Sequence, residues 1–180
     1  MVRAMSRAPG WLQDKLFERR LVLVTGRLDE TLAAQAAAQI MALDAAGDAP
    51  IDVVVDSGDG SLEAALVIVD VIDAVRAPVR VQCLGQVKGA ALGVAAAGDE
   101  RAASPHTTFC LSAPVVKAAG TPDEVAAQAD QHRYVLCKFQ ARLAKATGRP
   151  ADDIADDISR GRYLSAREAV DYGLIDAIRV

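Results

Sequence analysis

Short runs of β-branched residues alternate with helix-forming segments along most of this chain, and this alternation limits the fold more than any other feature. Three runs have the length and composition of buried strands, at 21–25, 51–55 and 79–84. A helical segment follows each of them, at 29–42, 62–75 and 90–97. Two short strands are expected next, at 101–103 and 107–111, and a final strand at 174–180. The pattern predicts an α/β fold with mostly parallel strands.

Two glycine-rich segments and a short helix complete the expected connections. Residues 56–61 (DSGDGS) are expected to form a tight connection after the second strand, and 85–89 (GQVKG) follows the third. Near the C-terminus, Ser165 and Glu168 have the spacing of a capping box and predict a short helix that Gly173 ends.

The strongest helix signal covers residues 122–147. Thr121 is the expected N-cap, Pro122 occupies the first helical position, and Glu124 completes a capping box. At about 1.5 Å per residue this helix is about 39 Å long, which is more than a small domain needs internally. Its apolar residues form one stripe: Val125, Ala129, Leu136, Phe139 and Leu143. We expect the helix to project and to bury this stripe against another molecule; the alternative is a surface helix lying on its own domain.

Length, charge and cysteine content narrow the class of protein. A chain of 180 residues favours one domain, here 14–180 after a short N-terminal extension at 1–13. The net charge of −4 argues against nucleic acid as the main partner, and the most apolar stretch, 64–69, is too short to span a membrane. With no secretory signal and three cysteines that lack metal-ligand spacing, we predict a cytoplasmic protein without metal or cofactor. The aspartates Asp152, Asp153, Asp156 and Asp157 lack calcium-loop spacing and are expected to form the solvated face of a helix.

Five segments, in this order, resemble the ClpP peptidase family, whose fold is that of the crotonase superfamily. They are DKLFERRLVLVTGRLDE (14–30), VVVDSGDGS (53–61), CLGQVKGAALGVAAAG (83–98), ATGRPADDI (146–154) and RYLSAREAVDYGLID (162–176). The resemblance implies a spiral of βαβ units with a long protruding handle helix. It also implies self-association into heptameric rings, since in this family the handle interlocks two rings into a tetradecamer.

Members of the family carry a Ser–His–Asp triad, and the resemblance places its three positions at Gly89, Ser112 and Gly161. A serine nucleophile needs a base within hydrogen-bonding reach, and that base needs an orienting group. Glycine has no side-chain atom with which to attack a carbonyl. The two histidines, His106 and His132, lie elsewhere in the sequence. We therefore predict no catalytic residues and no useful peptidase turnover.

The resemblance also places the backbone donors of an oxyanion hole at Gly60 and Ala90. Just before Gly60, the family has a proline and a glycine; in this chain Gly58 replaces the proline and Asp59 replaces the glycine. A carboxylate at Asp59 would repel the charge that such a hole stabilises, in line with the missing triad.

These observations leave several functions open. The first is a structural or regulatory pseudo-peptidase in a Clp-type ring, alone or with an active ClpP paralogue; an AAA+ unfoldase is a doubtful partner because few residues precede the matched region. The second is an ATP-dependent Clp protease proteolytic subunit with residual or unconventional serine-type activity, in which Lys88 would activate Ser112. Cys110 as a thiol nucleophile competes with a simple packing role. Acyl-thioester binding at the backbone N–H pair is a third possibility.

Overall fold

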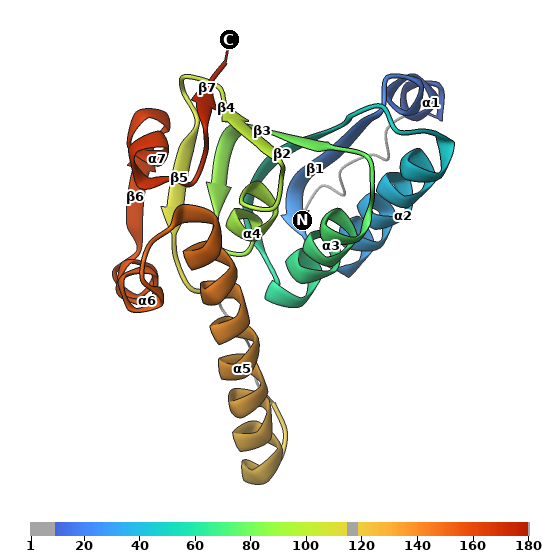
Figure 1. Cartoon of the computed structure of the whole chain (residues 1–180). Coiled ribbons are helices and arrows are strands. Elements are labelled where there is room, and N and C mark those ends of the chain that lie inside the picture. The colour runs from blue at the N-terminus through green and yellow to red at the C-terminus, as the bar shows by residue number, and fades with distance from the viewer. Residues whose placement is uncertain (1–9, 115–118, 180) are drawn as a thin grey trace, which may run out of the picture.

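The computed structural model describes residues 10–114 and 119–179 and has the predicted α/β architecture (Figure 1). In chain order its elements are α1 (Gly10–Glu18), β1 (Leu21–Leu28), α2 (Glu30–Ala46), β2 (Ile51–Gly60), α3 (Leu62–Ala74), β3 (Val79–Lys88), α4 (Ala91–Ala95), β4 (Glu100–Ala103), β5 (Thr108–Leu111), α5 (Pro122–Thr147), α6 (Ala151–Arg160), β6 (Arg162–Ser165), α7 (Ala166–Tyr172) and β7 (Ala177–Ile178). The strands form one sheet in the order β1-β2-β3-β4-β7, while β5 pairs with both β3 and β6. The pairing of β5 with β6 is antiparallel and the other pairings are parallel, which confirms the predicted fold class.

One face of the sheet forms the core. Alternate residues of β1 and β2, such as Val22, Val24, Val53 and Val55, are fully buried, and α2 and α4 contact this pair of strands. Alanine-rich helices can approach the sheet closely, which explains how a chain with only 4% aromatic residues forms a continuous core.

The central strands continue beyond their predicted ends. β2 includes the segment 56–60 and β3 includes 85–88, both of which were expected as connections. The register shifts between Val55 and Ser57, so an irregularity lets the strand continue through glycines. Gly60 permits this at its end: a β-carbon there would lie 2.5 Å from Cβ of Leu28 in the paired strand.

Other boundaries also differ from expectation: β1 continues through Gly26 to Leu28 instead of ending at 25, and α2 continues to Ala46 instead of ending at 42. Strand β6 and helix α1 were not anticipated, and α1 spans part of the predicted N-terminal extension, of which 1–9 lie outside the described residues. The final strand is confined to Ala177–Ile178, because it pairs only with β4, itself a strand of four residues.

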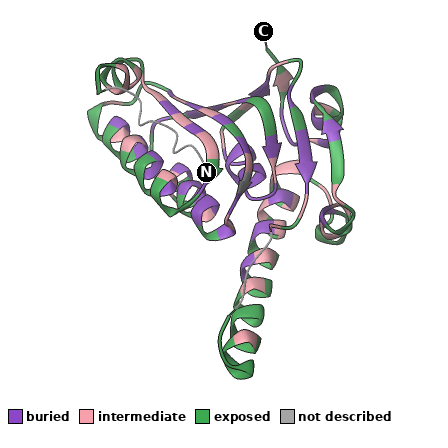
Figure 2. Ribbon diagram, turned by 180° about the vertical axis from the view of Figure 1, so that it is seen from behind, coloured by how far each residue is buried: buried purple, intermediate pink, exposed green. Residues whose placement is uncertain are grey.

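Helix α5 begins and ends where the sequence predicts, with the capping box of Thr121 and Glu124 present. It projects from the rest of the molecule (Figure 1). Its buried residues, Val135, Phe139 and Leu143, lie in its C-terminal half, and the projecting half is almost entirely exposed (Figure 2). The predicted stripe is therefore half covered by the chain itself, while Ala129 stays exposed. In the described part of the chain, every helix is too short or too polar to cross a lipid bilayer.

Candidate functional site

Gly89 lies at the carboxyl edge of the sheet, between the end of β3 and the start of α4. Its φ is +56°, a left-handed conformation that favours glycine, and its N–H donates to the carbonyl of Cys110 over 3.1 Å. A β-carbon built on Gly89 would lie 3.7 Å from Oγ of Ser112 and 3.9 Å from Cγ of Pro114. The position that the family resemblance assigns to a nucleophile thus faces the position that it assigns to a histidine.

Strand β6 brings the third position to the same edge. The last pair of the antiparallel ladder is Leu111 with Arg162. Ser112 follows Leu111 and Gly161 precedes Arg162, so both lie at this end of the ladder. Gly161 ends α6 in a left-handed conformation, with a φ of +67°, and a β-carbon there would meet no atom within 4 Å. The three positions Gly89, Ser112 and Gly161 therefore converge, although they come from three separate segments.

Neither histidine hydrogen-bonds to this cluster. His106 is exposed in the turn before β5, whereas Ser112 is six residues further along the chain, past the other end of that four-residue strand. His132 lies on α5, and its Nδ1 is buried without a hydrogen-bond partner among the described residues. Among the described residues, neither imidazole is therefore hydrogen-bonded to Ser112.

Lys88 precedes Gly89 and pairs with Cys110 in the β3–β5 ladder. Among the described residues, Lys88 and Ser112 share no hydrogen bond. Cys110 is 1% exposed, which favours a packing role over that of a thiol nucleophile. Burial also raises the pKa of Cys83 to about 12, so that this thiol stays protonated.

The two oxyanion-hole positions also lie at this edge. Gly60 ends β2, and Ala90 follows Gly89 as the N-cap of α4; the pairing of Ser57 with Val87 holds β2 and β3 together near these ends. Gly60 also has a packing reason to be glycine, the close approach of Leu28. The side chain of Asp59 lies outside the described residues, so its expected repulsion of negative charge stays a prediction.

Asp56 is a positioning residue that sequence reasoning missed. Its Oδ1 accepts a hydrogen bond from the backbone N–H of Gln86 over 3.1 Å, and a β-carbon on Gly85 would lie 2.6 Å from the same oxygen. Asp56 therefore holds the backbone of Gly85 and Gln86, which precede the turn at Gly89 between β3 and α4. The only signal in the sequence is an aspartate directly after an apolar strand.

A second cluster holds the start of β6 and corrects the expectation that Asp157 is solvated, because the Asp157 side chain is only 14% exposed. The hydroxyl of Tyr172 donates to Oδ2 of Asp157 over 2.8 Å, and Arg162 donates to both oxygens of the same carboxylate. Burial and the bond to Asp157 raise the pKa of Tyr172. The guanidinium of Arg149 stacks 4.0 Å from the Tyr172 ring centre. These contacts hold the backbone around Gly161 in place, although Gly161 itself contributes no side chain.

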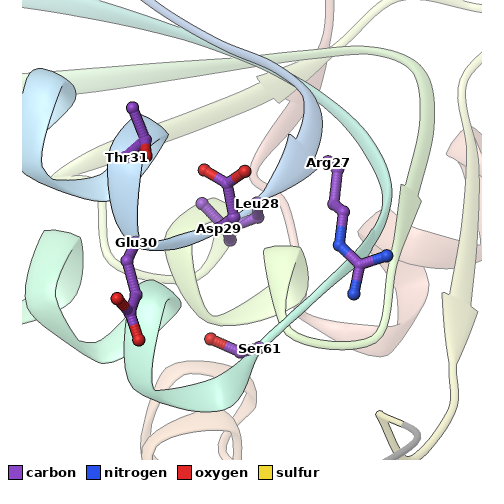
Figure 3. A pocket seen from close by; sticks show the side chains of 6 residues that line it. All are labelled: Arg27, Leu28, Asp29, Glu30, Thr31 and Ser61. Atoms are coloured by element: carbon purple, nitrogen blue, oxygen red, sulfur yellow. The ribbon is translucent and has the colours of Figure 1, made fainter. Parts of the chain in front are cut away.

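A cavity of about 310 Å³ opens beside Ser61, at the amino ends of α2 and α3 (Figure 3). Asp29 and Ser61, which cap these helices, line it together with Arg27, Leu28, Glu30 and Thr31. None of the three triad positions lines this cavity. Among the described residues, no group of three or more His, Cys, Asp or Glu side chains is arranged to hold a metal ion.

The fold and its edge cluster define an α/β spiral protein with a projecting helix, and comparisons with known proteins give the family. The Clp protease family matches residues 9–180. The chain is 34% identical over 167 residues to the ATP-dependent Clp protease proteolytic subunit of Paracoccus denitrificans, covering 92% of this chain and 84% of that protein. It is 32% identical over 168 residues to proteolytic subunit 1 of Corynebacterium diphtheriae, covering 91% and 80%. The chain belongs to the Clp protease family.

Proposed function

We propose that this chain is a catalytically inactive subunit of a Clp-type ring, with a structural or regulatory role. The observation that carries the proposal is the convergence of Gly89, Ser112 and Gly161 at one edge of the sheet. Gly89 faces Ser112 but has no hydroxyl or thiol that could act as a nucleophile. The histidine position holds Ser112, whose hydroxyl cannot act as a base at neutral pH. Binding of substrate without a triad leaves only about 10³–10⁴-fold acceleration over water in serine proteases.

Hydrolysis of a fluorogenic peptide by the purified protein tests this proposal. We expect the unmodified protein to hydrolyse the peptide no faster than the variant Gly89→Val, in which the site is removed. The same assay on Gly89→Ser alone should stay at background, because a serine without a base gains little. Turnover by the unmodified chain, above that of Gly89→Val, would contradict the proposal.

A hydrolase that uses Ser112 is the second candidate, supported by the names of the relatives and by the position of Ser112 beside the elbow. Lys88 would have to turn toward Ser112 and lose its proton to activate it. A fluorophosphonate probe, which reacts only with an activated hydroxyl, separates the two candidates. Labelling of Ser112 that Lys88→Met abolishes would favour the hydrolase.

The projecting half of α5 supports the ring assembly. Val125 and Ala129 continue the line of Phe139 and Leu143, yet nothing in the described chain covers Ala129. We expect a second ring to cover this half, as in the family. Ala129→Glu should therefore halve the native mass, whereas Ala127→Glu, on the opposite side of the same helix, should not. Equal masses for both variants would count against this role for α5.

A further inference from the structure

A second cavity of about 310 Å³ opens where α3 and α4 meet α5. It is lined by the C-terminal ends of α3 and α5, by the residues that follow α4, and by β4. Its volume is at the lower end of the range that small-molecule sites occupy, roughly 300–1,000 Å³. Gly89 and Ala90 precede α4, whereas this cavity adjoins the residues after α4, so it is separate from the triad positions.

Charged side chains line this cavity, and the cations are in excess. The cations are Arg101, Arg142 and Lys145, and the carboxylates are Asp73 and Asp99. This excess runs against the net charge of the whole chain, which is −4. Both carboxylates already have partners. Arg142 donates to both oxygens of Asp73, and the N–H of Val79 donates to Oδ2 of Asp99.

Several N–H donors at the cavity have no acceptor among the described residues. Lys145 is exposed and forms no hydrogen bond or ion pair with that part of the chain. The guanidinium of Arg142 has more donors than acceptors beside it: Asp73 and the carbonyl of Ala97 accept three, and its buried Nε has no partner among the described residues. Arg101 is better satisfied, because one carboxylate and two carbonyls accept four of its hydrogen bonds. The cavity therefore offers more donors than acceptors.

We propose that this cavity binds the phosphate group of a small molecule. A phosphate monoester carries a charge of about −1.5 to −2 at neutral pH and accepts hydrogen bonds on three oxygens. Lys145 supplies a mobile ammonium, and Arg142 supplies a guanidinium that Asp73 holds in place. The cavity is larger than a phosphate alone requires, so it also has room for the organic part of a monoester.

This inference goes beyond the proposed function and does not depend on it. A ligand held here would link the C-terminal ends of α3 and α5 to the segment after α4, a helix that begins beside Gly89. Since such a ligand binds the folded chain and not the unfolded one, it should also raise the melting temperature.

Isothermal titration calorimetry with inorganic phosphate, at constant ionic strength, tests the site. We expect the unmodified protein to bind phosphate and Lys145→Met to raise the dissociation constant about tenfold, because the ligand loses a charged donor. Lys138→Met, the same change at an exposed position of α5 outside the cavity, should leave the dissociation constant unchanged. Equal affinities for the unmodified protein and Lys145→Met would overturn the proposal.

Glycerol 3-phosphate in the same titration distinguishes two sources of the phosphate group. Tighter binding of glycerol 3-phosphate than of inorganic phosphate would assign the cavity to a monoester. Equal or weaker binding would assign it to free phosphate. In both cases Lys145→Met should weaken the binding.

Asp99→Asn should act in the opposite direction. It removes a negative charge from the cavity, while its amide oxygen can still accept from the N–H of Val79, so phosphate should bind several-fold tighter. The rise in melting temperature that phosphate gives, relative to chloride at the same ionic strength, should be largest for Asp99→Asn and smallest for Lys145→Met. Phosphate also stabilises proteins by exclusion from their surface, and this effect is the same for all variants. Equal rises for the unmodified protein and both variants would therefore show that phosphate acts through the solvent alone and would overturn the proposal.

Discussion

A β-carbon on Gly89 would lie 3.7 Å from the hydroxyl oxygen of Ser112, so the residues that follow β3 and β5 face each other at the edge of the sheet. The nearest atom to this β-carbon is the carbonyl oxygen of Ser112 at 3.5 Å, an ordinary contact, so there is room for a β-carbon at Gly89. The backbone there is left-handed, so a substitution costs about 1 kcal/mol in conformational strain rather than in steric overlap.

Rebuilding the triad should therefore produce activity. Gly89→Ser, Ser112→His and Gly161→Asp together restore a nucleophile, a base and an orienting carboxylate at convergent positions. Because triad residues act as a unit, we expect the triple variant to hydrolyse a fluorogenic peptide roughly 10²-fold faster than any single variant. The same variant with Ser112→Gln in place of Ser112→His is the matched control, and equal rates for the two would show that the positions do not cooperate.

Gly60 should tolerate no side chain. The β-carbon of Gly60→Ala would lie 2.5 Å from Cβ and 2.6 Å from the carbonyl oxygen of Leu28, so β1 and β2 must move apart. We expect a loss of about 1–3 kcal/mol in the free energy of unfolding, measured by urea denaturation. Gly10→Ala, where a β-carbon meets nothing within 4 Å, is the control. An unchanged midpoint for Gly60→Ala would show that the strands separate freely.

Arg101 joins the C-terminal ends of α5 and α7 to β4. It donates to the carbonyls of Ala146 and Gly173 and pairs with Asp176, and its side chain is only 15% exposed. Arg101→Ala should lower the free energy of unfolding by about 2 kcal/mol, because these acceptors lose a charged donor. Arg179→Ala removes an exposed ion pair with Glu100 and should cost less than about 1 kcal/mol. Equal losses would contradict the account.

The ion pair between Arg101 and Asp176 predicts that the free energy of unfolding depends on pH. Burial alone would raise the pKa of Asp176, but hydrogen bonds and charge from Arg101 lower it below its usual value. A lowered folded-state pKa stabilises the protein above the unfolded-state value, about 3.9, and this contribution is lost as the pH falls through the folded-state pKa. Asp176→Asn should therefore unfold more readily than the original chain at pH 7, with the difference shrinking toward pH 2. A constant difference across this range would exclude the ionised carboxylate as its source.

Cysteine reactivity should report on the fold. Cys137 is exposed on α5, whereas Cys83 and Cys110 are buried, and burial raises the pKa of Cys83 to about 12. We expect iodoacetamide at pH 8 to modify only Cys137 in the folded protein and all three thiols in urea, as measured by intact mass. Modification of Cys110 in the folded protein would show that its strand opens.

Much of the fold could be predicted from local signals. The strand β1, the N-cap at Asp29 and both capping boxes depend on residues close together in the sequence, and all are present. The extensions of β2 and β3 through glycine-rich segments could not be predicted, because pairing between strands overrides the preference of glycine for turns. Strand β6 was missed for the same reason: its four residues form a strand only because β5 lies beside them.

The candidate site, too, could be predicted from the sequence only in part. Gly89, Ser112 and Gly161 could be named from a family resemblance, since each lies beside a recognisable segment. Their closeness is a property of the sheet, in which β3 and β6 both pair with β5. The role of Asp56 was missed and Asp157 was wrongly expected to be solvated, because their partners, Gln86 and Tyr172, are 30 and 15 residues away in the chain.

The most direct test of the central claim is the intact mass of the protein after incubation with a fluorophosphonate probe. An inactive subunit predicts an unchanged mass, at a probe concentration that fully labels an active Clp protease. A mass increase of one probe, located at Ser112 or another hydroxyl at this edge of the sheet, would contradict it.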